Sequence, residues 1–148
     1  MAFDDSKIKQ SNEELESRLI KDRIEWKNKI VDLIAQIKIM SKLADCQVNM
    51  LSYRQILLDK MGELKNTIYK RNAAWERYYK LEYREYSINY DLKLTGGEKH
   101  QFIRADLSSL KNQIEMLQGH VEYYQECIKT LDNLAFAIRN RIRLEDEE

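Results

Sequence analysis

Residues 103–142 read IRADLSSLKNQIEMLQGHVEYYQECIKTLDNLAFAIRNRI, and this stretch decides the fold. Its apolar positions recur in alternating steps of four and three residues. They are Ile103, Leu107, Leu110, Ile114, Leu117, Val121, Tyr124, Ile128, Leu131, Ala135, Ile138 and Ile142. A spacing of 3.5 residues sustained over this length is the pattern of a coiled-coil helix. We therefore expect a long helix covered by other helices, because such a helix is not stable alone in water.

The apolar side of this expected helix is wider than a two-stranded seam. Met116, Tyr123, Cys127, Leu134 and Phe136 lie beside the heptad positions. A broad apolar face favours packing against more than one neighbour, as in a helical bundle or a ring. We predict that the heptad residues form an oligomer interface. The predicted interface residues are Leu107, Leu110, Ile114, Leu117, Val121, Tyr124, Ile128, Leu131, Ile138 and Ile142.

The composition of the 148 residues also indicates long helices, because there is no proline and there are only four glycines. The net charge is zero, so bulk charge indicates neither a nucleic-acid nor a membrane partner. No apolar run reaches the length of about 18 residues that a membrane span needs, and the acidic start does not resemble a signal peptide. Cys46 and Cys127 lie in helical patterns, which favours packed thiols in a reducing cytoplasm over a disulfide.

We expect an all-α chain with one helical domain over residues 12–144, between a flexible N-terminus and an acidic tail. Ser11 and Asn12 precede two acidic residues, which is typical of a helix start. The expected segments are a flexible N-terminus at 1–11, helices at about 12–44, 47–86 and 106–144, and an acidic tail at 145–148.

A short extended insert is expected at about residues 87–103. Ile88, Tyr90, Leu92 and Leu94 alternate with polar residues, which is the period of a β-strand. Residues 95–98, Thr-Gly-Gly-Glu, predict a turn. Residues 99–103 then return as the second strand of a small hairpin, and Asp106 is predicted to cap the last helix.

The sequence does not favour catalysis. Neither His100 nor His120 has a Cys, Asp or Glu at a distinctive metal-ligand spacing. His120 falls on a flank of the heptad, where we expect an exposed side chain. Motifs for a P-loop, a dinucleotide site and a nucleophile elbow are absent. We predict no enzyme activity, no catalytic or metal-binding residue and no cofactor.

The stretch from Lys70 to Arg104 carries eight Lys or Arg against five Asp or Glu, interleaved with tyrosines. Cations beside aromatic rings are what single-stranded nucleic acid needs for phosphates and bases. At about 100° per residue, four of the cations share one side of a helix, and Arg71 lies near them. The candidate DNA-binding residues are Lys70, Arg71, Arg77, Lys80 and Arg84. An ordinary solvated helix face is an equally good interpretation.

A second line on the same helical wheel contains Tyr79, Tyr83, Tyr86 and Tyr90. This line lies roughly 135° from the basic line and continues the apolar side of the helix. We therefore expect these tyrosines in the core or in a subunit interface, rather than stacked on bases.

The order of the motifs resembles a known family. A basic segment ends in the pair Tyr78-Tyr79 and precedes the expected extended middle and the long last helix. The other similar motifs are Val48-Asn49-Met50-Leu51-Ser52-Tyr53, Ala105-Asp106, Leu110-Lys111, Val121-Glu122-Tyr123, Leu131-Asp132 and Phe136-Ala137-Ile138-Arg139. Together they resemble the UvsY-like recombination mediators of T-even-type bacteriophages, over most of the chain from about Lys42 onward.

The resemblance implies a small homo-oligomer, a ring or bundle of six or seven subunits, that binds single-stranded DNA non-specifically in the host-cell cytoplasm. Such a protein helps to load a RecA-like recombinase onto strands coated by a single-stranded-DNA-binding protein, and it has no membrane partner. In that family a lysine and an arginine contact DNA five and three residues before the paired tyrosines. Here these positions are Ala73 and Trp75, with Lys70, Arg71 and Arg77 about one helical turn away.

The alternative is a structural coiled-coil adaptor, such as a phage assembly chaperone or scaffold subunit, without nucleic-acid binding. It requires only the heptads and the broad apolar faces, and the neutral net charge favours it.

Overall fold

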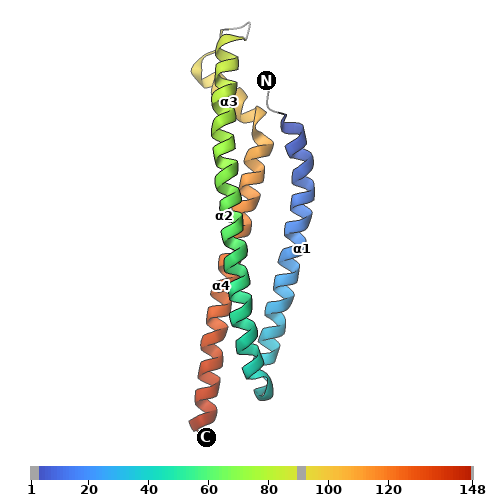
Figure 1. Ribbon diagram of the computed structural model, residues 1–148, viewed down its shortest axis with the longest axis vertical. Coiled ribbons are helices and arrows are strands. Elements are labelled where there is room, and N and C mark those ends of the chain that lie inside the picture. Colours follow the sequence, from blue (N-terminus) through green and yellow to red (C-terminus); the bar gives the residue numbers. More distant parts are fainter. Residues whose placement is uncertain (1–3, 90–92, 148) are drawn as a thin grey trace. The chain divides into compact units, whose positions relative to one another are not determined.

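The computed structural model describes residues 4–89 and 93–147. These residues form α-helices and one short 3-10 turn and contain no strand, which confirms the all-α expectation (Figure 1). The elements are α1 (Asp5–Ile37), η1 (Met40–Lys42), α2 (Leu43–Ile88), α3 (Gly96–Asp106) and α4 (Ser108–Glu147).

The chain groups into two compact units. Unit 1 consists of Met1–Arg18 and Leu64–Gly119, and unit 2 consists of Leu19–Glu63 and His120–Glu148. Each unit takes one segment from α1, one from α2 and one from α4, and unit 1 also contains α3. Each unit therefore has its own small set of packed helices.

The first helix begins earlier than the expected start near residue 12. Asp4 Oδ1 accepts hydrogen bonds from the Ser6 backbone N–H at 3.2 Å and from the Ser6 hydroxyl at 2.5 Å. This arrangement satisfies a free N–H group at the start of α1. Asn12 lies inside the helix, where its Nδ2 donates to the Ser109 carbonyl oxygen at 2.8 Å.

The connection between α1 and α2 lies at residues 38–42, a little before the expected break. The backbone N–H of Ile39 donates to the Gln36 carbonyl oxygen at 3.0 Å, which tightens the chain as α1 ends. Arg141 of α4 donates from Nη2 to the Lys38 carbonyl oxygen at 3.1 Å. One of the arginines near the end of α4 thus satisfies a free carbonyl at the end of α1.

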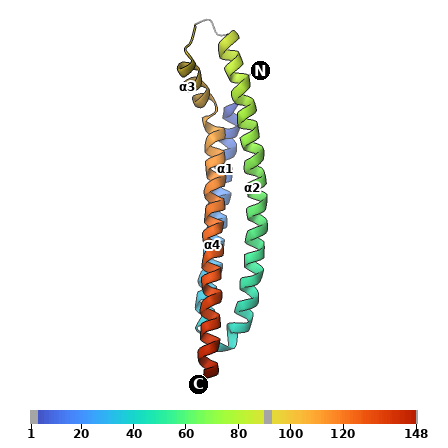
Figure 2. The same ribbon diagram turned by 90° about the vertical axis from the view of Figure 1, so that its left-hand side faces the viewer.

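α3 replaces most of the expected extended insert, so the predicted hairpin is wrong. α2 continues to Ile88, and residues 99–103 are helical. Thr95 Oγ1 accepts from the Glu98 backbone N–H at 3.2 Å, and Glu98 Oε1 accepts from the Thr95 backbone N–H at 3.4 Å. This capping box starts α3. Figure 2 shows α3 beside the end of α2. Tyr90 and Leu92 of the predicted strand lie outside the described residues.

The junction between α3 and α4 lies at Leu107. Asp106 ends α3, and its carboxylate accepts a hydrogen bond from the Tyr86 hydroxyl at 2.5 Å. The predicted role of Asp106 as the cap of the last helix is therefore wrong. Asp5 of α1 instead accepts from the Ser109 backbone N–H at 3.3 Å, in the first turn of α4.

The heptad residues are largely buried within a single chain. The buried residues are Leu107, Leu110, Ile114 and Leu117 in unit 1, and Val121, Tyr124, Ile128, Leu131 and Ile138 in unit 2. Ile142 is half-buried. The helices of the chain itself cover these side chains, and each full burial of a large apolar side chain stabilises the fold by about 1.5–3 kcal/mol. That these residues form an interface between copies of the chain stays a prediction. Such an interface requires α4 to leave the helices that cover it within its own chain.

Candidate nucleic-acid interface

The five candidate DNA-binding residues all lie on α2 within unit 1, and all five side chains are exposed. Lys70, Arg77, Lys80 and Arg84 follow at helical spacing along one side of α2, and we call these four residues the basic ridge. At 1.5 Å per residue, the basic ridge extends about 21 Å along the helix. Arg71 lies about 100° around the helix from Lys70, so it faces another direction.

The basic ridge has no carboxylate partner among the described residues. The ion pairs found there join Arg54 to Asp132, Lys60 to Asp22 and His120 to Asp22, all within unit 2. Residues 64–88 of α2 carry six Lys or Arg and three Glu, one of which is buried. The exposed surface of this segment is therefore positive, although the whole chain is neutral.

α3 engages the tyrosine side of α2. The Tyr79 hydroxyl and His100 Nδ1 form a hydrogen bond, and the two rings stack with centroids 5.6 Å apart. The Tyr83 ring lies 5.5 Å from the same histidine. Because α3 was expected to be extended, this contact between the two helices was not predicted.

Tyr86 is engaged in the same way. Its hydroxyl bonds to Asp106, and its ring stacks on Phe102 with centroids 5.8 Å apart. Tyr79 and Tyr86 are half-buried, whereas Tyr83 is 37% exposed, so these tyrosines line the contact with α3 and are not fully buried in the core. Tyr90 lies outside the described residues. Tyr69 differs, because it is 74% exposed and directly precedes Lys70.

The two positions where the similar family carries cations have different surroundings. Ala73 is exposed on the side of the basic ridge. Trp75 is half-buried, with its ring 4.9 Å from Tyr79, and Lys111 Nζ lies 5.8 Å from its centroid. Position 75 therefore faces α4, and the exposed cations nearest in sequence are Arg71 and Arg77.

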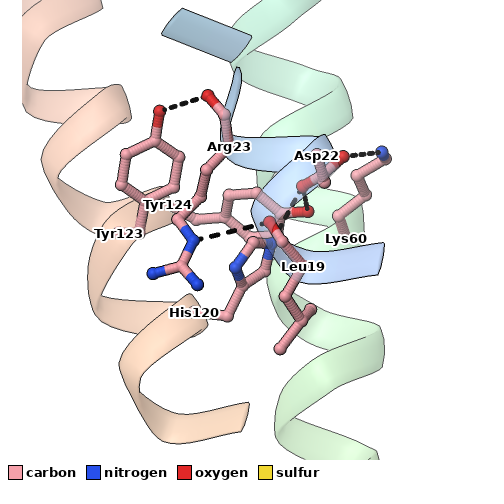
Figure 3. Close-up of polar contacts among 7 residues, drawn as sticks. All are labelled: Leu19, Asp22, Arg23, Lys60, His120, Tyr123 and Tyr124. Atoms are coloured by element: carbon pink, nitrogen blue, oxygen red, sulfur yellow. Dashed lines mark hydrogen bonds and ion pairs between the residues drawn. The ribbon is translucent and has the colours of Figure 1, made fainter. Parts of the chain in front are cut away.

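A second polar site lies in unit 2 around Asp22 of α1 (Figure 3). Asp22 Oδ2 accepts from the Tyr124 hydroxyl at 2.5 Å and lies 2.9 Å from His120 Nε2. Asp22 Oδ1 accepts from Lys60 Nζ at 3.3 Å. Figure 3 shows the side chains converging from α1, α2 and α4. We call Asp22, Lys60, His120 and Tyr124 the Asp22 cluster.

His120 is 2% exposed, so its predicted position on the surface is wrong. Burial lowers the pKa of His120, and this effect exceeds the opposing hydrogen bond and charge of Asp22. The neutral ring donates its Nε2–H to Asp22. His120 Nδ1 is then a buried acceptor without a hydrogen-bond partner among the described residues.

The carboxylate of Asp22 stays charged because its donors outweigh its burial. Burial raises its pKa, but hydrogen bonds from Tyr124 and His120 and the charge of Lys60 bring the pKa below its ordinary value. Burial and the hydrogen bond to Asp22 raise the pKa of Tyr124, so its hydroxyl remains a donor. The cluster therefore ties three helices of unit 2 together through one shared acceptor.

Sequence reasoning missed the Asp22 cluster because its members are far apart in the chain. Asp22 and His120 are 98 residues apart, and no local pattern links them. The available signal was the spacing of His120 and Tyr124, which lie one helical turn apart with Tyr124 on the apolar side.

In the described part of the chain, no three His, Cys, Asp or Glu side chains come together as metal ligands. None of the helices described there is long and apolar enough to cross a membrane. The chain matches no protein-family model, and no curated protein or solved structure matches it.

Proposed function

We propose that this chain binds single-stranded DNA non-specifically through the basic ridge of α2 and acts as a recombination mediator. In this role it helps to load a RecA-like recombinase onto strands coated by a single-stranded-DNA-binding protein. The observation that carries the DNA-binding part is the line of four exposed cations without a carboxylate partner among the described residues. The mediator part depends on the resemblance of the motifs to the UvsY-like family.

The ridge suits a phosphate backbone better than bases. Its cations follow one line of about 21 Å, which allows several phosphates of one strand to be contacted in sequence. Tyr79, Tyr83 and Tyr86 already contact rings of α3, which leaves less of their surface for stacking on bases. Binding should therefore be strongly salt-dependent and nearly independent of base sequence.

A single ridge gives modest affinity, so the proposal includes a homo-oligomer in which several ridges act on one strand. The heptad residues are covered within the chain, but a second apolar line on α1 in unit 2 is open. Ile20, Ile24, Val31 and Ile34 are between 42% and 55% exposed. We propose this line as the contact between copies, and light scattering during size-exclusion chromatography tests it. A monomer at all concentrations, with and without oligonucleotide, would contradict it.

The test of DNA binding replaces Lys70, Arg77, Lys80 and Arg84 together by alanine. Affinity for a labelled oligonucleotide should fall at least tenfold at moderate salt. The slope of log K against log salt should decrease by roughly three, since each phosphate contact on a single strand contributes about 0.7. Fluorescence anisotropy over a salt series measures both quantities.

The matched control removes four exposed lysines from unit 2 instead: Lys21, Lys27, Lys42 and Lys129. It changes the net charge equally but leaves the basic ridge intact. Circular dichroism checks that both variants fold. If the ridge variant is folded and binds with the affinity and slope of the control, the proposed interface is wrong.

A structural adaptor is the second candidate, and an apolar hollow in unit 2 favours it. α2 and α4 line this hollow, with a volume of about 410 Å³ and walls that include Ala44, Val48, Leu51 and Ala135. Val48 and Leu51 are 66% and 71% exposed, which is unusual for large apolar side chains that lie side by side. The same oligonucleotide titration separates the two candidates, because an adaptor binds no DNA at any salt concentration.

A further inference from the structure

A small groove in unit 1 brings together side chains that suit an anion. It has a volume of about 160 Å³ and is lined by three helices. The lining residues are Ser11, Leu15 and Arg18 of α1, Thr67 and Arg71 of α2, and Gln113 and Leu117 of α4. Gln113 and Leu117 are buried and form its floor, whereas both arginines are exposed at its edge.

The groove is lined by two cations and no acid. Neither Arg18 nor Arg71 takes part in an ion pair of the described residues. Glu14, one turn before Arg18 on α1, forms no ion pair with it either. Two guanidinium groups that share a groove repel each other, and an anion placed between them removes this repulsion.

The floor of the groove contains an unsatisfied polar group. Gln113 is 5% exposed, and its side-chain oxygen is buried without a hydrogen-bond partner among the described residues. Such a group ordinarily costs about 1–3 kcal/mol. Rotation of the amide by 180° replaces the oxygen by the NH₂ donor at the same volume, which suits an anion that accepts hydrogen bonds.

The donor set identifies the class of ligand. Two guanidinium groups and a buried amide surround the groove, and no carboxylate lines it, so it suits an anion. Guanidinium groups bind phosphate through two parallel hydrogen bonds, which favours this anion for a pair of arginines.

We propose that the groove between Arg18 and Arg71 is a phosphate-binding site, and that its ligand is a backbone phosphate of the DNA strand that follows the basic ridge. The source of the phosphate rests on the proposed function, because Arg71 is the direct neighbour of Lys70 at one end of the ridge. Arg71 lies about 100° around α2 from Lys70, so a strand that passes from the ridge to the groove turns around this helix. α1 thereby contributes to the interface through Arg18.

The first experiment tests the groove without DNA. Inorganic phosphate is titrated into the chain against chloride at equal ionic strength, and the side-chain Nε–H resonances of Arg18 and Arg71 are followed by NMR. Both resonances should shift and saturate in phosphate but not in chloride. An absence of any phosphate-specific shift overturns the site, whatever the chain does with DNA.

The second experiment tests the source of the phosphate with an oligonucleotide. The double variant Arg18→Gln/Arg71→Gln should lose about tenfold in affinity, and its salt slope should decrease by roughly 1.4, which corresponds to two phosphate contacts. Arg18→Lys/Arg71→Lys keeps the charge and should keep most of the slope, but it should lose several-fold in affinity because the paired hydrogen bonds are gone.

The matched control is Lys7→Gln/Lys65→Gln, which removes two exposed cations from the same helices and the same unit. If the double arginine variant binds DNA like this control while the basic-ridge variant does not bind, the backbone phosphate is the wrong ligand and the proposed function stands. If the parent binds no oligonucleotide, the proposed function fails. Phosphate-specific NMR shifts in that case support the groove as a site for free phosphate.

Discussion

The four cations of the basic ridge on α2 face solvent without an acidic partner among the described residues. Around Asp22, in contrast, one carboxylate is shared by Lys60, His120 and Tyr124. Polar groups whose hydrogen bonds are completed inside the chain stabilise the fold, and they have little capacity left for a ligand. Exposed charges without partners contribute little to the fold and remain available for binding. The contrast predicts that substitutions in the cluster change stability and that substitutions on the ridge change binding.

The largest effect on stability is expected when the acceptor of the cluster is removed. Asp22→Ala leaves Lys60, His120 and Tyr124 without their shared carboxylate, and the free energy of unfolding should fall by about 3 kcal/mol. Urea unfolding followed by circular dichroism measures this change. Asp32→Ala, an exposed position on the same helix, should change stability by less than about 0.5 kcal/mol. If both variants lose the same free energy of unfolding, Asp22 contributes no more to stability than an exposed aspartate does.

A smaller loss of stability is expected when the pH is lowered. The pKa of folded His120 lies below the ordinary value of about 6.5, so the unfolded chain binds this proton first as pH falls. The stability contributed by neutral His120 is fully present above pH 6.5 and is lost as pH falls toward 5. The slope is at most about 1.4 kcal/mol per pH unit for one proton. Urea unfolding at several pH values between 5 and 7 measures it.

Two histidine variants test whether His120 causes this pH dependence of stability. His120→Gln should flatten the slope between pH 5 and 7, even if the variant is less stable at every pH. His100→Gln, which changes the other histidine, in unit 1, is the matched control, and the slope should fall more in His120→Gln than in this control. A slope that persists in His120→Gln would show that another group carries it.

The smallest effect is expected at the contact between α2 and α3. Tyr86→Phe removes the hydroxyl that donates to Asp106, and it should destabilise the packing of α3 by about 1 kcal/mol. Hydrogen exchange of the α3 backbone amides should become faster. Tyr69→Phe, which alters a 74% exposed ring on the same helix, should leave the exchange unchanged. Similar exchange in both variants would mean that the hydroxyl does not hold α3.

The heptad of residues 103–142 predicted which side of the last helix is buried, from Leu107 to Ile138. It did not predict what covers this side, because periodicity identifies an apolar face but not the helix that packs against it. The covering helices turn out to belong to the same chain. The exposure of the basic ridge was also predictable, since its four cations share one side of a helix.

Two other errors have physical causes. The alternation of residues 88–94 and the turn composition of residues 95–98 predict a hairpin whose second strand falls on α3, although Thr95 and Glu98 have the spacing of a capping box. A capping box at this spacing indicates the start of a helix. The burial of His120 had no comparable signal, because its partner Asp22 is distant in sequence and a flanking heptad position is usually exposed.

Cys46 and Cys127 are free and buried, and both belong to unit 2. Burial raises the pKa of each thiol, so little thiolate is present while the unit is closed. Unit 1 contains no cysteine. The rate at which a thiol reagent labels the native chain therefore reports the opening of unit 2 alone, without any added probe. The two units can thus be distinguished by their local opening equilibria even where an unfolding transition shows only one step.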